Sequence, residues 1–206
     1  MYAGRNSMRG SIVPTSVRPI PTSIFSTPSA GCFLTQRRRR EVSLMKIETS
    51  RFGTIEVSPD QVFTFPMGLL GFAKYKEFVV IDHTEDSPFK WLQSVEEGSL
   101  AFIITDPLFF CPNYQIKVRR SELSMLKTIG EDDLVVSVIM TIPENPQDMT
   151  ANLLAPLIFN MGNRTGMQHV LTNSSYSVKF SVLKEKPANP LPVLADGKRP
   201  KAISLS

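Results

Sequence analysis

The sequence contains little cysteine and histidine and no long hydrophobic run. Cys32 and Cys111 are its only two cysteines, and they lie in regions of different composition, so an internal disulfide framework is not expected. Unpaired cysteines are typical of a reducing cytoplasm. No stretch approaches the roughly 18 to 20 consecutive apolar residues that a membrane-spanning helix needs. We therefore predict a cytoplasmic protein that has no membrane partner.

Residues that commonly carry catalysis are equally scarce. The two histidines, His83 and His169, lie in no recognisable motif, and no base or cation neighbours Cys111 in the sequence. There is also no glycine-rich phosphate loop, no paired-cysteine metal spacing and no nucleophile elbow. We therefore expect a protein that is not an enzyme, with no cofactor, no metal and no small-molecule substrate.

Basic residues are concentrated at the two ends of the chain, and acidic residues in its middle. The formal net charge of the whole sequence is +4. Residues 1–44 carry a net charge of +6 and residues 184–206 one of +3, whereas residues 45–183 hold 11 Lys and Arg against 16 Asp and Glu, a net charge of −5. An acidic body repels phosphate backbones and attracts basic proteins. We expect protein partners and no direct contact with nucleic acid.

Composition divides the sequence into three parts. Residues 1–44 are rich in Ser, Thr, Pro and Arg, and prolines interrupt each short apolar run. They predict a disordered basic leader, or sequence upstream of a true start at Met45. Residues 184–206 contain four prolines and predict a flexible tail. Residues 45–183 remain as one globular domain.

Short runs of β-branched and aromatic residues, separated by turn residues, dominate residues 45–183. This pattern is typical of antiparallel sheets and not of alternating strands and helices. Gly53 predicts a tight hairpin between the first two strands, and Pro156 predicts an edge or a bulge. The predicted fold class is mostly β, a small antiparallel β-barrel-like or sandwich domain with one short helix. The predicted strands cover 46–50, 54–57, 62–65, 78–82, 89–95, 100–105, 114–118, 134–142, 150–160 and 169–171.

The one predicted helix covers residues 121–129. Ser121 can cap its first amides, Leu123 and Leu126 share one face, and Gly130 can end it. The segment would be a short helix.

Residues 65–72 form an unusual loop, in which two glycines and a proline accompany five apolar side chains. The loop either folds over the end of the core or faces a partner, because an exposed apolar patch of this size marks an interaction site. The sequence leaves both interpretations open.

Several distinctive segments follow one another in a fixed order along residues 45–183. They are Phe65-Pro66 with Gly68 and Gly71-Phe72, then Ser87-Pro88-Phe89 leading into Leu92-Gln93-Ser94, then Thr150-Ala151-Asn152-Leu153 with Ala155-Pro156, and last Asn163-Arg164, Gly166 and Gln168. In this order and spacing the segments resemble the FliW family of bacterial flagellar assembly factors. The short β segment at Met45, followed by a Gly-centred hairpin, also looks like a family N-terminus.

The resemblance implies a small β-barrel-like fold and two protein partners. It implies binding to flagellin in the cytoplasm, and binding to the RNA-binding translational regulator CsrA, which relieves CsrA repression of flagellin mRNA translation. It implies no cofactor and no catalysis. Residues 1–44 and the tail after Leu183 depart from the family pattern.

Two groups of residues are candidates for contact with these partners. Acidic residues near the segment 87–94 would attract a basic RNA-binding protein such as CsrA. The edge at Pro156 and the loop 160–168 would offer flagellin a strand-pairing or groove site. The candidate residues are Glu85, Asp86, Phe89, Glu96, Glu97 and Asp106 in the first region, and Asn152, Asn163 and Arg164 in the second.

Two functions of other classes remain open from the sequence alone. The run of four arginines, residues 37–40, would suit a nucleic-acid-binding β-barrel protein with a basic N-terminal arm. Alternatively, Asp82 and His83 would form the centre of an unrecognised metal or proton-transfer site, although an ordinary polar turn after a strand has the same composition.

Overall fold

The structure is a computed structural model that describes residues 44–84, 87–127, 132–172, 174–183 and 202–205. These residues form strands, turns and four 3-10 helices of three residues each. The predicted mostly β fold is therefore confirmed. The strands are β1 (Met45–Thr49), β2 (Gly53–Val57), β3 (Val62–Thr64), β4 (Glu77–Asp82), β5 (Phe89–Ser94), β6 (Ala101–Thr105), β7 (Ile116–Val118), β8 (Leu134–Thr141), β9 (Thr150–Ala151), β10 (Leu157–Asn160), β11 (Thr165–Gln168), β12 (Phe180–Ser181) and β13 (Ile203–Leu205), and the 3-10 helices are η1 (Pro59–Gln61), η2 (Pro107–Phe109), η3 (Ser124–Leu126) and η4 (Pro146–Asp148).

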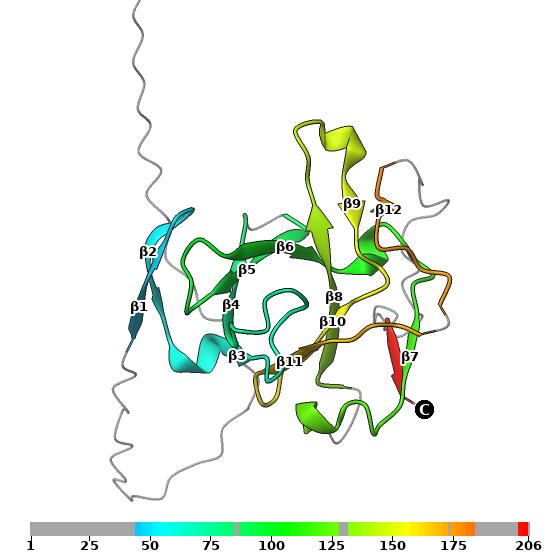
Figure 1. The fold of residues 1–206 in the computed structure, drawn as a ribbon, viewed down its shortest axis with the longest axis horizontal. Helices are drawn as coiled ribbons and strands as arrows, with labels where there is room; N and C mark the ends of the chain where they lie inside the picture. Colours follow the sequence, from blue (N-terminus) through cyan, green and yellow to red (C-terminus); the bar gives the residue numbers. More distant parts are fainter. Residues whose placement is uncertain (1–43, 85–86, 128–131, 173, 184–201, 206) are drawn as a thin grey trace, which may run out of the picture. The chain divides into compact units, whose positions relative to one another are not determined.

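Seven of these strands close into a barrel (Figure 1). Their hydrogen-bonded order is β10, β11, β3, β4, β5, β6 and β8, and β8 pairs back with β10. Every pair in this ring is antiparallel except β11 with β3, which is parallel and consists of the single position Thr165↔Thr64. There the Thr64 amide donates to the Arg164 carbonyl at 2.9 Å. The β3–β11 joint is thus the shortest contact in the ring.

Aromatic and aliphatic side chains fill the inside of the barrel. Because side chains alternate along a strand, one residue in two points inward. The Phe65 ring packs edge-on against Phe78 at 5.4 Å and Phe159 at 5.5 Å between ring centroids. It also lies on Gly166, where an added Cβ would come within 2.4 Å of the ring. The inner cluster comprises Phe63, Phe65, Leu69, Phe78, Leu92, Ile104, Leu157 and Phe159.

The hairpin of β1 and β2 covers the outer face of β3 and β4. Gly53 adopts a φ of +66° in its turn, as the predicted tight hairpin requires. Ile47 and Val57 of the hairpin pack against Val62 and Val79. The hairpin thus forms one apolar layer outside the barrel.

A second outer layer covers β8 and β10. It contains β7, η3 and β13. Their buried side chains share one cluster with Val136, Val138 and Ile158, which we call the outer cluster. β13 pairs with β7 in parallel. Within the predicted tail, residues 184–206, the structure describes residues 202–205, and Ile203 is buried against this layer. Residues 184–201 and the predicted leader up to residue 43 lie outside the described residues.

The predicted helix over residues 121–129 is wrong in its described part, which forms turns and η3 (Ser124–Leu126). Leu123 and Leu126 are buried on one side, as the helical pattern suggested. However, Lys127 adopts a left-handed φ of 48°, which ends η3 at once. A short helix gains few hydrogen bonds for the residues it fixes, so tertiary contacts decide its form.

The predicted strand over residues 150–160 is divided into β9 and β10. Between them the Asn152 side-chain oxygen accepts a hydrogen bond from the Ala155 amide at 3.0 Å, which bends the chain. Pro156 lies in this interruption, where its missing amide breaks no ladder. The predicted strand at 169–171 is also wrong, because the strand that pairs with β10 is β11, at Thr165–Gln168.

Candidate partner-binding surfaces

The loop between β3 and β4 runs across the ring of strands at one mouth of the barrel (Figure 1). Its side chains divide into two sets. Phe65 and Leu69 point inward and are buried, whereas Met67, Leu70 and Phe72 are 66%, 59% and 37% exposed. The loop therefore folds over the end of the core through its two buried side chains, and it leaves three apolar side chains exposed. We call the three exposed side chains the mouth patch.

Two glycines fix the path of this loop. Gly68 has a φ of +67°, and a Cβ added to it would lie 2.8 Å from the Cα of Ala73. Gly71 has a φ of +81°. Both values lie in the left-handed region, which residues with a Cβ rarely adopt. The loop thus takes a defined conformation that holds the mouth patch at the surface.

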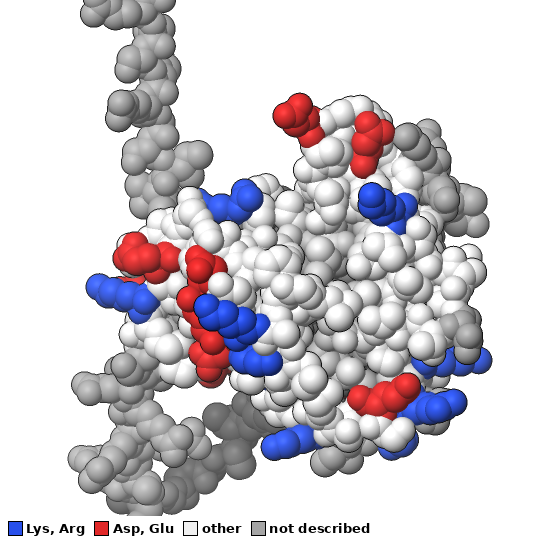
Figure 2. Space-filling view, viewed as in Figure 1, with Lys and Arg blue, Asp and Glu red and all other residues white. Residues whose placement is uncertain are grey.

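Neighbouring elements hold the mouth patch from two sides. The Phe72 ring packs edge-on against Phe102 of β6, with 5.1 Å between centroids. The Leu70 amide donates to the side-chain oxygen of Gln168 at 2.9 Å, and the Gln168 amide group donates to the Ala155 carbonyl. Figure 2 shows that the middle of this face carries no charged side chains, while Lys, Arg, Asp and Glu gather towards its edges. The face is therefore suited to an apolar contact.

Glu96 and Glu97 lie together in the turn between β5 and β6. The Glu96 carboxylate accepts hydrogen bonds from the amides of Lys76 and Glu77, at the end of the mouth loop. The Glu97 carboxylate accepts from the Ser99 hydroxyl at 2.7 Å and from its amide at 3.2 Å. These bonds lower the pKa of Glu97 below its ordinary value, because they favour the charged form of the carboxyl group.

A buried glutamine supports this turn from beneath. The Gln93 amide group donates to the carbonyls of Ser94, Gly98 and Leu100 at 3.0 to 3.2 Å. Gly98 sits so close to β1 that a Cβ there would lie 1.9 Å from the Glu48 carbonyl. The turn that carries the two acidic residues is consequently fixed to the barrel.

Asp106 and Phe89, the other described candidates of this region, lie at the other end of β5. Phe89 pairs with Thr105, next to Asp106, whereas Ser94 leads into Glu96. The five residue steps between Phe89 and Ser94 span about 17 Å in an extended strand. Asp106 accepts from the Leu108 amide at 2.9 Å and so caps η2, and Phe89 packs against the outer cluster. Glu85 and Asp86 lie outside the described residues.

The candidates near Pro156 mostly bond within the chain. The Leu126 carbonyl accepts from the side-chain amides of Asn160 at 2.9 Å and Asn163 at 2.7 Å, and from the Thr165 hydroxyl at 3.3 Å. The Arg164 guanidinium lies over the Phe63 ring, 5.0 Å from its centroid. Together with Asn152, which bends the chain before β10, these side chains shape the barrel edge.

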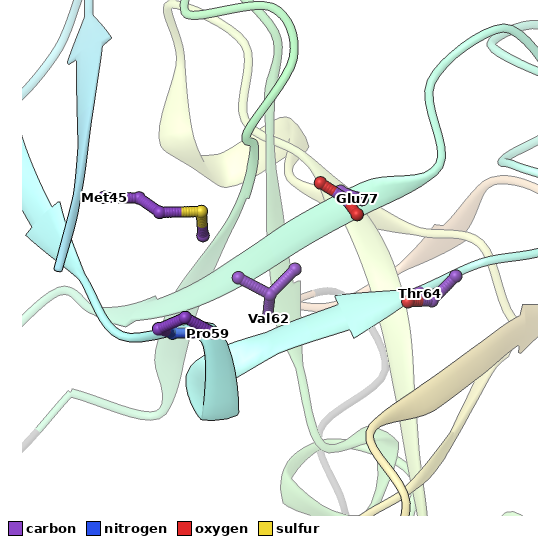
Figure 3. Close-up of a pocket in the computed structure, with 5 residues that line it drawn as sticks. All are labelled: Met45, Pro59, Val62, Thr64 and Glu77. Atoms are coloured by element: carbon purple, nitrogen blue, oxygen red, sulfur yellow. The ribbon is translucent and has the colours of Figure 1, made fainter. Parts of the chain in front are cut away.

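A small pocket lies beside the hairpin, outside the barrel (Figure 3). Its volume is about 190 Å³, and it is lined by Met45, Pro59, Val62, Thr64 and Glu77. Among these five described residues, Glu77 is the one with an ionisable side chain. Nowhere in the described part of the chain do three or more His, Cys, Asp or Glu side chains gather as a metal site.

Comparison with known proteins gives the family of the chain. The model of the FliW protein family matches residues 46–182. The chain belongs to the FliW family. The flagellar assembly factor FliW of Alkaliphilus metalliredigens is 39% identical over 142 residues, which cover 68% of this chain and 88% of that protein. FliW of Thermoanaerobacter pseudethanolicus is 40% identical over 142 residues, covering 68% and 95%.

A solved FliW structure confirms the fold. The crystal structure of a flagellar assembly factor FliW matches with a TM-score of 0.63 and 36% identity, and covers 67% of this chain and 96% of that one. The family predicted from the sequence motifs is thus confirmed. None of the described helices has the length and apolar character to cross a membrane.

The sequence identified the mouth loop but not its exposed side chains. Apolar residues at 65, 67, 69, 70 and 72 follow no single periodicity. Only the positive φ values at Gly68 and Gly71 turn Met67 and Leu70 outward while Leu69 enters the barrel. The two glycines were the available signal, although their spacing alone does not give the direction of each side chain.

Proposed function

We propose that this FliW-family chain binds flagellin and CsrA in the cytoplasm, and that its binding to CsrA relieves repression of flagellin mRNA translation. The observation that carries the proposal is the FliW family match over residues 46–182, the part of the chain that forms the barrel. The relatives are named flagellar assembly factors. A factor of this kind acts by binding other proteins, which requires exposed contact surfaces and no chemistry.

For flagellin, we propose the mouth patch and the neighbouring β11 edge as the contact surface. Protein interfaces are depleted of charge at their centres and secured by a few large apolar side chains. Met67, Leu70 and Phe72 provide such a centre. Gln168 connects the patch to β11 through its bond to the Leu70 amide. The mouth patch would then cover an apolar surface on flagellin.

For CsrA, we propose the turn that carries Glu96 and Glu97. Its two carboxylates project beside the mouth loop, to which Glu96 is hydrogen-bonded. Negative charge attracts a basic RNA-binding protein and raises the rate of association. Phe89 and Asp106 would then form a second, separate part of the contact at the far end of β5. Glu85 and Asp86, which lie outside the described residues, stay candidates for the same contact on their charge.

The test is direct binding of the full-length chain to each purified partner. Isothermal titration calorimetry with flagellin and, separately, with CsrA should give saturable binding in both cases. A translation assay on a flagellin mRNA leader repressed by CsrA should then recover when the chain is added. Absence of binding to both proteins would refute the proposal. Binding to the mRNA leader itself, without CsrA, would instead favour a nucleic-acid-binding function.

A further inference from the structure

The edge of β7 is occupied by a segment from far along the chain. β13 pairs with β7 in parallel, in the register Ile203↔Ile116, Ser204↔Lys117 and Leu205↔Val118. The Ile116 amide also donates to the Ala202 carbonyl at 2.9 Å. The FliW family match ends at residue 182, so it includes β7 and excludes β13. This chain therefore adds a strand to an edge that belongs to the family fold.

Two side chains hold the added segment in place. Ala202 and Ile203 are 7% and 4% exposed and join the outer cluster with Ile116 and Val118. Ser204 faces solvent beside the exposed Lys117. A parallel pair of three residues is weak by itself, because parallel ladders are less stable per residue and two-stranded sheets are marginal in water. Apolar burial at two positions therefore supplies most of the attachment.

We propose that the β7 edge is a docking groove for an extended peptide, which this chain fills with its own residues 202–205 in competition with a segment of a partner protein. The groove selects a small residue followed by a branched apolar residue, the positions held by Ala202 and Ile203. It also selects an acidic residue at the position of Ser204, because Lys117 lies opposite and Arg119 and Arg120 follow at the exposed end of β7. This inference goes beyond the proposed function and depends on neither flagellin nor CsrA.

The test uses the full-length chain and fluorescein-labelled synthetic peptides with the sequence of residues 201–206. One peptide keeps serine at the position of Ser204, one has glutamate there and one has lysine. Fluorescence anisotropy should show tightest binding for the glutamate peptide and weakest binding for the lysine peptide. Each charge change is expected to alter affinity about two- to fivefold, the range of cross-strand pairs.

Variants of the chain's own segment provide the competition test. Ile203→Asp places a charge in the cluster and should release the segment, raising peptide affinity at least about tenfold because a buried unpaired charge is strongly disfavoured. Ser204→Lys and Ser204→Glu alter only an exposed position, so the fold is retained. Ser204→Lys places a second positive charge beside Lys117, so it should weaken the docking of the chain's own segment and strengthen peptide binding. Ser204→Glu should stabilise the docked segment and weaken peptide binding.

Two results would overturn the proposal. One is equal peptide affinity of the Ser204→Lys and Ser204→Glu variants. The other is an Ile203→Asp variant that keeps the circular dichroism spectrum of the parent chain but binds no more peptide than the parent. Titration of these variants with flagellin and CsrA separates this outcome from failure of the proposed function, because the contacts proposed for those two proteins are on the mouth loop and the turn at Glu96.

Discussion

Two loops flank the joint between β3 and β11, and they use their side chains in opposite ways. The mouth loop, residues 65–76, exposes the apolar side chains of Met67 and Leu70 to solvent. The loop at residues 160–165 instead directs the amides of Asn160 and Asn163 to one buried carbonyl. Polar side chains thus build the fold at the second loop, while apolar ones remain available at the first. Residue type alone would have suggested the reverse.

The largest expected effect concerns the inward side of the mouth loop. Phe65→Ala should lower the free energy of unfolding by about 3 to 5 kcal/mol, because it removes a fully buried ring and leaves a cavity. Phe65 is 0% exposed and packs against two other rings. Urea unfolding followed by circular dichroism measures the loss. A change below about 1 kcal/mol would mean that the loop does not close the barrel.

The loop at residues 160–165 gives the next effect. Asn160→Ala should lower the free energy of unfolding by about 2 kcal/mol, because Asn160 is buried and the Gly162 amide would lose its acceptor. Asn163→Ala, at an exposed position, serves as the matched control with a smaller loss. Neither change should alter flagellin affinity in the folded protein. Asn163 and Arg164 stay candidates for the flagellin contact, and a weaker flagellin complex for Asn163→Ala or Arg164→Ala, at unchanged stability, would place them in the interface.

The outward side of the mouth loop should affect binding and not stability. The double change Met67→Ser and Leu70→Ser should weaken flagellin binding by about 1 to 2 kcal/mol per side chain, the range of apolar anchors in interfaces. The free energy of unfolding should change by less than about 0.5 kcal/mol, as at other exposed sites. Val135→Ser, at an exposed position of β8, is the control. Equal calorimetric affinity of both proteins for flagellin would exclude the mouth patch.

The smallest expected effect concerns charge. Glu96→Gln with Glu97→Gln keeps the hydrogen-bond acceptors but removes two negative charges. Association with CsrA, followed by stopped-flow fluorescence, should slow about threefold or more at low salt and converge with the parent rate at high salt. Glu144→Gln, on the far loop between β8 and η4, should leave the rate unchanged. An unaltered rate for the double variant would place the CsrA contact elsewhere.

Local sequence signals predicted the strands β1 to β8 well, but they predicted the later strands and the irregular segments poorly. The hairpin at Gly53 followed from a residue that tolerates positive φ, and the structure gives it a φ of +66°. The spacing of Leu123 and Leu126 suits a helix and a compact turn equally. The outcome depended on Asn160, Asn163 and Thr165, which bond the Leu126 carbonyl from another part of the chain. No window around residue 126 contains that information.

The candidate surfaces show the same limit. Sequence proximity predicts one surface for acidic residues that lie within about 20 positions of one another, but β5 separates Phe89 from the turn at Glu96. β13 was also missed, because a three-residue strand after a proline-rich segment gives no periodicity to detect. Its attachment depends on the exposed edge of β7, which only the folded barrel creates.

The sequence by itself determined the family, the mostly β class and the acidic character of the middle of the chain. These properties depend on motif order, on side-chain alternation and on composition, all of which are local or additive. Only the tertiary structure decided which loop side chains reach solvent, which asparagines are used within the fold and where residues 202–205 dock. Each of these depends on partners distant in sequence, because hydrogen bonds and apolar contacts are satisfied in space and not along the chain.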